Sequence, residues 1–149
     1  MATTGDNRCF VDTNVLVYAN LLGSVHHKAA LEMLRHADVA ALELSISSQI
    51  AREYLAAVSR PQPNGPPPLT MAMAVAQVRL MLQRFQIIED GPEIRARLLT
   101  LLTTYPVAGK QVHDTNIVAT MLANGVTRLL TFNVADFRRF AGLITIEGP

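Results

Sequence analysis

Four acidic residues, Asp12, Glu53, Asp114 and Asp136, have a type and spacing that could support metal-dependent chemistry. In CFVDTNVLVYAN (residues 9–20), Asp12 and two further polar residues interrupt what is otherwise an apolar run. Taken singly, each acid also has a simple structural explanation. Asp12 could cap a helix, Glu53 could lie at the boundary of a packed helix, and Asp114 and Asp136 could occupy first helical turns, where a negative charge is favoured.

Short apolar strands that alternate with amphipathic helices provide the framework for these acids. Strands are expected at 8–11, 42–46, 86–89, 128–131 and 144–146, and helices at 14–20, 24–37, 48–60, 70–85, 93–103 and 112–123, with a helical turn at 136–140. Ser24 is the expected cap of the second helix. This alternation predicts a three-layer α/β/α sandwich around a central, mostly parallel sheet.

The predicted order of elements brings the four acids to one edge of that sheet. The carboxyl ends of parallel strands meet at a shared edge, where sites form. Asp12 directly follows the first strand, and Glu53 lies in the helix that follows the second. The helix of Asp114 leads into strand 128–131 and runs antiparallel to it, so its first turn stands at the same edge. Asp136 follows that strand, and four carboxylates should therefore meet.

Clustered carboxylates repel one another unless a positive charge compensates them. Arg52 adjoins Glu53 in sequence, but neighbouring residues on a helix do not face each other. All-oxygen ligation suits Mg²⁺ or Mn²⁺, and such a cation can promote attack on a phosphodiester. The polar residues expected to orient the carboxylates are Thr13, Asn14, Thr131 and Asn133.

Length and composition limit the remaining possibilities. The chain has 149 residues, of which 50% are hydrophobic, and we expect residues 1–149 to form a single domain. With 13 basic and 12 acidic residues, net charge gives no argument for nucleic-acid binding. Cys9 is the single cysteine and is expected to be buried. Residues 1–8 lack a signal-peptide pattern, and no apolar run approaches the roughly 20 residues of a membrane span, so a cytoplasmic location is expected.

Four segments resemble, in the same order, the sequence blocks of PIN-domain nucleases: FVDTNVLVYA, SSQIAREYL, VHDTNIVATMLANGV and LLTFNVADF. Length and block order are most similar to the VapC-type ribonuclease toxins of bacterial and archaeal toxin–antitoxin pairs. The resemblance implies an endoribonuclease that requires Mg²⁺ or Mn²⁺. In it, Asp12 and Asp114 match the principal metal-binding acids, and Glu53 and Asp136 match the remaining catalytic acids.

The resemblance also implies protein partners, and this sequence differs from the family pattern at one position. The toxins usually form homodimers and are blocked by a cognate antitoxin segment laid in a groove, and the methionine-rich helix at 70–85 is a candidate contact surface. Many members carry Asp where this chain has Asn133, which leaves the number of bound metals open. The proline-rich stretch at 61–69 lies outside the motif blocks and is expected to be a surface loop.

Two other classes of function remain open on the sequence. An aspartyl-nucleophile phosphotransferase or phosphatase usually has a second Asp two residues after the first, where this chain has Asn14. A non-catalytic PIN-like module could instead bind RNA or a protein. The nearby basic residues could contact phosphates but could equally be solvated: Arg52, Arg60, Lys110, Arg138 and Arg139. His113 is expected to lie at the same edge of the sheet as the acids, and His26 and His27 are expected to be solvated.

Overall fold

A five-stranded parallel sheet forms the centre of the protein, in a computed structural model that describes residues 6–149. The strands are β1 (Arg8–Val11), β2 (Glu43–Ser47), β3 (Gln86–Ile88), β4 (Arg128–Leu130) and β5 (Thr145–Glu147), and their spatial order is β3-β2-β1-β4-β5. The three central strands are almost wholly buried, because helices cover both faces of the sheet. The predicted three-layer α/β/α fold is therefore confirmed.

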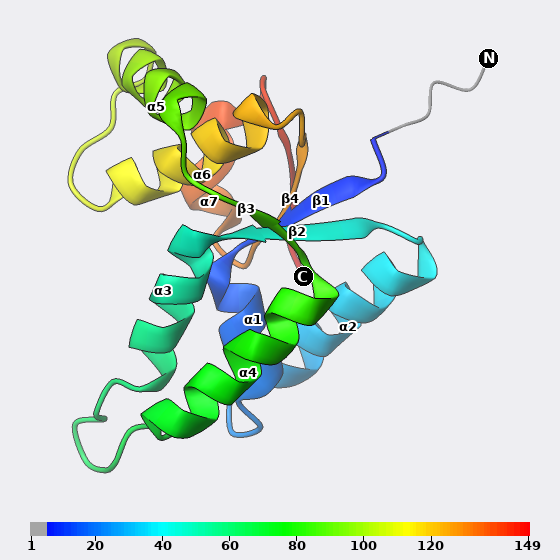
Figure 1. Ribbon diagram of the computed structural model, residues 1–149, viewed down its shortest axis with the longest axis vertical. Helices are drawn as coiled ribbons and strands as arrows, with labels where there is room; N and C mark the ends of the chain where they lie inside the picture. Colours follow the sequence, from blue (N-terminus) through cyan, green and yellow to red (C-terminus); the bar gives the residue numbers. More distant parts are fainter. Residues whose placement is uncertain (1–5) are drawn as a thin grey trace.

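The helices form two layers (Figure 1). Below the sheet in that view lie α1 (Thr13–Asn20), α2 (His27–Val39), α3 (Ser48–Val58) and α4 (Met71–Arg84). Above it lie α5 (Pro92–Thr104), α6 (Gln111–Ala123) and α7 (Val134–Phe137), which a short 3₁₀ turn, η1 (Arg138–Phe140), continues. In the described part of the chain, no helix is both long and apolar enough to cross a membrane.

The strand order creates a switch point between β1 and β4. From β1 the chain builds outward through β2 and β3, then returns and adds β4 on the other side of β1. Val11 pairs with Leu130 in the ladder, so the residues that follow, Asp12 and Thr131, leave the sheet side by side. Open parallel sheets bind ligands in the crevice outside such a point. The fold thus directs attention to the chain segments after β1 and β4.

Most predicted elements lie within one or two residues of the observed ones, and one predicted cap is wrong. Helix α2 begins at His27 rather than at Ser24, and the Ser24 hydroxyl accepts a hydrogen bond from the amide of His26 at 3.1 Å. Ser24 therefore closes a turn before the helix and does not cap its first residues. Ser47 caps α3, and Thr70 caps α4.

The proline-rich stretch at 61–69 forms the predicted surface loop. It contains an isolated bridge between Gln62 and Gly65, and its last residue, Leu69, is buried and donates its amide to the carbonyl of Val58. Cys9 is fully buried, as expected. Of the N-terminal segment interpreted above, residues 1–5 lie outside the described residues.

Candidate active site at the switch point

The carboxylate of Asp12 is fixed on both oxygens. Asp12 is the N-cap of α1, and its Oδ1 accepts the amide of Thr13 at 2.7 Å. Oδ2 accepts the hydroxyl of Thr131 at 2.7 Å and the amide of the Asn14 side chain at 3.2 Å. Asp12 is 6% exposed, and burial raises its pKa although these three donors act in the opposite direction. One side chain therefore caps α1 and also binds the segment that follows β4.

The loop after β4 is tied to this carboxylate through neutral polar groups. Asn14 accepts the backbone amide of Phe132 at Oδ1, at 3.0 Å, while its Nδ2 reaches Asp12. The hydroxyl of Thr131 accepts the backbone amide of Asn133 at 3.0 Å. These bonds join the segments that leave β1 and β4, so the position of Asp12 is set from both strands.

A second hydrogen-bonded chain holds Glu53 beside Asp12. Thr13 donates its hydroxyl to Oε2 of Glu53 at 2.8 Å, and Gln49 donates its side-chain amide to Oε1 at 2.8 Å. The same amide reaches the carbonyl of His113 at 3.1 Å, and Asn116 donates to Oε1 of Gln49 at 2.7 Å. Gln49 is buried, so helices α3 and α6 are joined through one interior side chain.

Asp114 lies among the other three acids. Burial first, and then the negative charges of Asp12, Asp136 and Glu53, raise its pKa from 3.8 to about 6, while His113 acts against them. These effects on Asp114 indicate that the other three carboxylates lie near it. Among residues 6–149, none of the ion pairs includes any of these four acids. The excess negative charge is therefore not compensated by a salt bridge within the described chain.

The donor set agrees with a hard divalent cation that keeps part of its water shell. Within the described residues, no three His, Cys, Asp or Glu side chains stand close enough to hold an ion by themselves. Mg²⁺ is commonly bound by only one or two carboxylates, with water filling the other positions. Asp12 and Asp114 meet that requirement, since they are oxygen donors on facing elements with the charge of two more acids beside them. The residues present therefore fit such an ion.

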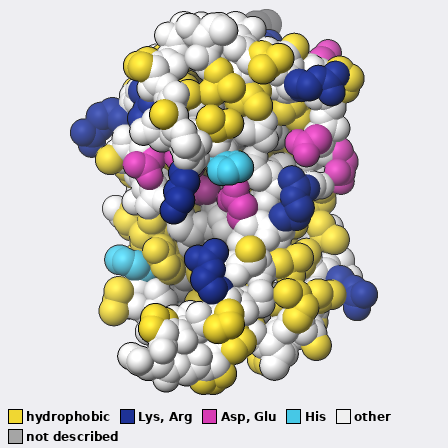
Figure 2. Space-filling view, turned by 90° about the vertical axis from the view of Figure 1, so that its left-hand side faces the viewer, with side chains coloured by type: hydrophobic (Ala, Val, Ile, Leu, Met, Phe, Trp, Pro, Cys, Tyr) yellow, Lys and Arg dark blue, Asp and Glu magenta, His cyan; other side chains and the backbone are white. Residues whose placement is uncertain are grey.

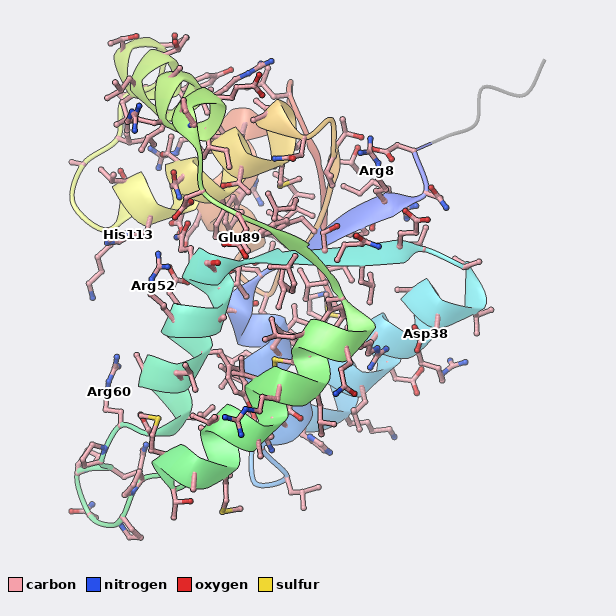
Figure 3. The ribbon with its side chains drawn as sticks, in the orientation of Figure 1. Arg8, Asp38, Arg52, Arg60, Glu89 and His113 are labelled. Atoms are coloured by element: carbon pink, nitrogen blue, oxygen red, sulfur yellow. The ribbon has the colours of Figure 1, made fainter. Side chains whose placement is uncertain are left out.

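Basic and acidic side chains share the face around this site. Figure 2 shows that face, with acidic side chains near its middle and basic side chains on several sides. Arg52 and Arg60 project on the same side of the molecule as His113 (Figure 3). Arg52 lies 3.9 Å from Asp90, and Arg139 donates to the carbonyl of Pro106 at 2.7 Å. Arg52 and Arg60 are exposed and Arg139 is partly buried, and none of the three forms an ion pair with the four acids in the described residues.

The structure brings the eight predicted site residues together, with two differences from the expected arrangement. Asn133 is exposed, and it contributes its backbone amide to Thr131, while its side chain makes no hydrogen bond within the described part of the chain. Asp136 is also exposed, at the start of α7, and acts on Asp114 by charge. Asn133 was expected to orient a carboxylate, and that role stays a prediction, since its side chain is exposed in the described structure.

Sequence reasoning missed Asn116, the residue that anchors Gln49. A signal for it exists in the printed sequence: the tripeptide Asp-Thr-Asn occurs after β1 as residues 12–14 and again in α6 as residues 114–116. In each copy the Asn links its own segment to a neighbouring one, through Phe132 in the first and Gln49 in the second.

Comparisons with known proteins agree with this arrangement. The PIN domain family model matches residues 9–143. No curated protein is significantly similar in sequence. Among solved structures, VapBC2 from Rickettsia felis bound to a promoter DNA fragment shares 22% identity with a TM-score of 0.66, covering 95% of this chain and 98% of the other.

Two further solved structures have the same fold. VapC20 of Mycobacterium tuberculosis, described as a sarcin-ricin loop cleaving toxin, is 18% identical with a TM-score of 0.66, covering 91% of this chain and 96% of the other. FitAcB from Neisseria gonorrhoeae is 21% identical with a TM-score of 0.62, covering 93% and 95%. At such sequence identities, the structural similarity shows that the fold is the same, and the match to the family model shows membership of the family. The resemblance detected in the four sequence blocks is thus confirmed, and this chain belongs to the PIN domain family.

Proposed function

We propose that this protein is a metal-dependent endoribonuclease that hydrolyses RNA phosphodiester bonds and serves as the toxin of a type II toxin–antitoxin pair. The observation that carries the proposal is the group of four acids in which Asp12, Asp136 and Glu53 raise the pKa of Asp114, and none of the four has an ion-pair partner among the described residues. Membership of the PIN domain family and likeness to VapC20, described as a sarcin-ricin loop cleaving toxin, support it.

Asp12 and Asp114 are the side chains that would hold Mg²⁺ or Mn²⁺. When bound, the cation lowers the pKa of water and offsets negative charge at the phosphate under attack. Thr131, Asn14 and the amide of Thr13 hold Asp12 in one orientation, so no reorganisation of that ligand is needed. Glu53, held by Thr13 and Gln49, keeps an acceptor beside Asp12 that can position water.

The hydrogen bonds at Asp12 favour this role over covalent catalysis by the same residue. A carboxylate nucleophile must present an unencumbered oxygen to the phosphorus atom. Both oxygens of Asp12 accept hydrogen bonds from buried donors, and the side chain is 6% exposed. This arrangement fixes a ligand and lowers nucleophilicity, so it supports hydrolysis by water over a phosphoaspartate intermediate.

The proposal extends to partners and location. We assign a cognate antitoxin protein as the inhibitor, since a similar structure from Klebsiella pneumoniae is described as a toxin–antitoxin complex. We further propose a homodimer in the cytoplasm, with residues 1–149 acting as one nuclease domain. Exposed Met71 and Met73 on α4 provide adaptable apolar contacts for such partners.

Cleavage of RNA by the purified chain tests the proposal. With Mg²⁺ or Mn²⁺ present, the wild-type protein should cut single-stranded RNA, and EDTA or Asp12→Asn should reduce the rate by at least about 100-fold. Asp38→Asn is a matched control, because Asp38 pairs with exposed Arg84 and lies far from His113 (Figure 3). Equal cleavage by wild type and Asp12→Asn would exclude the assigned site. Binding of RNA without cleavage in either metal would favour a non-catalytic module.

Induction in cells tests the toxin role separately. The wild-type chain should arrest growth, and Asp12→Asn should not, at matched protein levels. Co-expression of the cognate antitoxin should restore growth. Arrest by Asp12→Asn to the same extent would show that toxicity does not come from the acidic site.

A further inference from the structure

Three aromatic side chains, Tyr18, His26 and Phe132, form a cluster at the edge of the acidic site. Tyr18 contacts Phe132 edge to face, with ring centroids 4.9 Å apart and planes at 82°. His26 lies 4.8 Å from Tyr18 and 5.3 Å from Phe132, in tilted arrangements. These separations are typical of favourable aromatic pairs. We call this group the aromatic cluster.

The aromatic cluster is joined to Asp12 by a short chain of hydrogen bonds. The backbone amide of Phe132 donates to Asn14, and Asn14 donates to the carboxylate of Asp12. Tyr18 lies four residues after Asn14 on α1, which places it one turn further along the same side of that helix. The aromatic cluster therefore begins within two side chains of the residue assigned to the metal.

Two hydrogen bonds hold the aromatic cluster in place at the surface. His27 donates its ring N–H at Nδ1 to the carbonyl of Tyr18 at 2.9 Å, and Ser24 accepts the amide of His26 at 3.1 Å. These two bonds fix the turn that carries His26. His26 is exposed, while Tyr18 and Phe132 are only partly buried, so aromatic surface remains in contact with water. The expectation of solvated histidines holds for His26, which is exposed although it packs against two rings, and is wrong for His27, which is partly buried and hydrogen-bonded.

We propose that the aromatic cluster stacks the base of an unpaired nucleotide next to the phosphodiester at the acidic site, which makes it a substrate-positioning surface for single-stranded RNA. The inference rests on the proposed function. Proteins that bind single-stranded RNA commonly stack its bases on Phe, Tyr and His. A base within a duplex is stacked on its neighbours and cannot reach such a surface. The cluster therefore selects unpaired segments.

Stacking also supplies an attraction that the acidic site lacks. The four carboxylates repel the phosphate backbone until a cation compensates them, and the exposed arginines around them act through salt-dependent contacts. Contact between a base and an aromatic ring carries no charge and does not require the cation. The aromatic cluster can therefore hold RNA at the correct place before the metal-dependent step.

Binding in EDTA, where no cleavage occurs, tests the aromatic cluster without relying on catalysis. Two fluorescent oligomers of equal length and charge are compared by anisotropy: single-stranded RNA, and an abasic ribose-phosphate chain. His26→Ala and Phe132→Leu should each weaken binding of RNA by about fivefold or more. Neither should change binding of the abasic chain. His36→Ala is the matched control, because His36 is an exposed histidine of α2 that pairs with Glu32.

The outcomes separate this inference from the proposed function. Equal weakening of both oligomers, or no weakening, would overturn the stacking role, as would failure of the wild type to bind RNA. Base-dependent binding that is lost in both variants supports it, even if Mn²⁺ produces no cleavage, in which case the nuclease proposal alone fails. Duplex RNA of the same sequence should bind equally to wild type and variants. Thermal unfolding of each variant controls for loss of structure, which His26→Ala, at an exposed position, should not cause.

Discussion

Replacement of Asp114 by Asn should stabilise the metal-free protein while it abolishes cleavage. Burial first, and then the charges of three neighbouring acids, raise the pKa of Asp114 from 3.8 to about 6. A difference of about two pKa units is equivalent to about 3 kcal/mol between the ionised and protonated forms. Because Asp114 is only half-buried, solvent screening reduces this to about 1.5 kcal/mol, and loss of a favourable first-turn charge removes about 0.5 kcal/mol. About 1 kcal/mol of stabilisation remains.

The direction of the pH dependence follows from the same shift in pKa. Since the folded protein holds the proton of Asp114 more tightly than the unfolded chain, stability falls as pH rises between about 4 and 6 and is then constant. The advantage of Asp114→Asn should therefore be absent at pH 4 and complete at pH 7.5. For a chain of this length, about 1 kcal/mol corresponds to a rise in Tm of about 2–4 °C.

Thermal unfolding followed by circular dichroism, in EDTA at both pH values, measures this difference. Addition of Mn²⁺ should give the wild type the higher Tm, because the wild type binds the ion more tightly. A free Mn²⁺ concentration of about 100 times Kd adds about 2.7 kcal/mol to the free energy of unfolding. Asp90→Asn is a control for loss of one negative charge at an exposed site, where Arg52 lies 3.9 Å away and the effect should stay within about 0.5 kcal/mol. A lower Tm for Asp114→Asn in EDTA at pH 7.5 would refute the argument that these acids repel one another.

Two further substitutions test the neutral groups that hold the carboxylates. Thr131→Val removes the buried hydroxyl that donates to Asp12. It should lower the free energy of unfolding in urea by about 2 kcal/mol and lower the cleavage rate at least about tenfold. Thr120→Val is the control and should leave cleavage intact, because the hydroxyl of Thr120 donates to a carbonyl of its own helix. Gln49→Leu leaves Glu53, Asn116 and the carbonyl of His113 without their shared partner. It should lower the free energy of unfolding by about 1–3 kcal/mol. An unchanged free energy of unfolding would show that water replaces the side-chain amide.

The sheet edge and its acids could be predicted from sequence because local patterns determine them. Buried strands are short apolar runs, and each acid comes at a fixed place relative to such a run. Parallel pairing then brings the ends of the strands together without further information. Helix boundaries were less certain, as at Ser24, where a hydroxyl can close a turn as readily as cap a helix.

The hydrogen-bonded connections and the aromatic cluster could not be predicted in the same way. Gln49 meets Asn116 across 67 positions of sequence, and Thr131 meets Asp12 across 119. Such contacts depend on the register of β1 with β4 and on how α3 packs near α6, which no local pattern specifies. Tyr18 and Phe132 likewise look like ordinary apolar positions until the fold places them beside His26.

The two copies of Asp-Thr-Asn show how neutral side chains keep a repulsive group of acids assembled. In the first copy Thr13 bonds Glu53 and Asn14 bonds both Asp12 and the loop after β4. In the second, Asn116 fixes Gln49, which in turn holds Glu53. Each bond connects a carboxylate or its neighbour to a different element, so the separation of one acid from the rest would break contacts in several elements at once. The protein can therefore maintain the carboxylates together before a cation arrives, at a cost that the raised pKa values of Asp12 and Asp114 reveal. That cost, which comes from burial first and from repulsion between the acids second, is what a bound cation would relieve, and for this reason the same residues should govern both the stability of the metal-free fold and the affinity of the site for its ion.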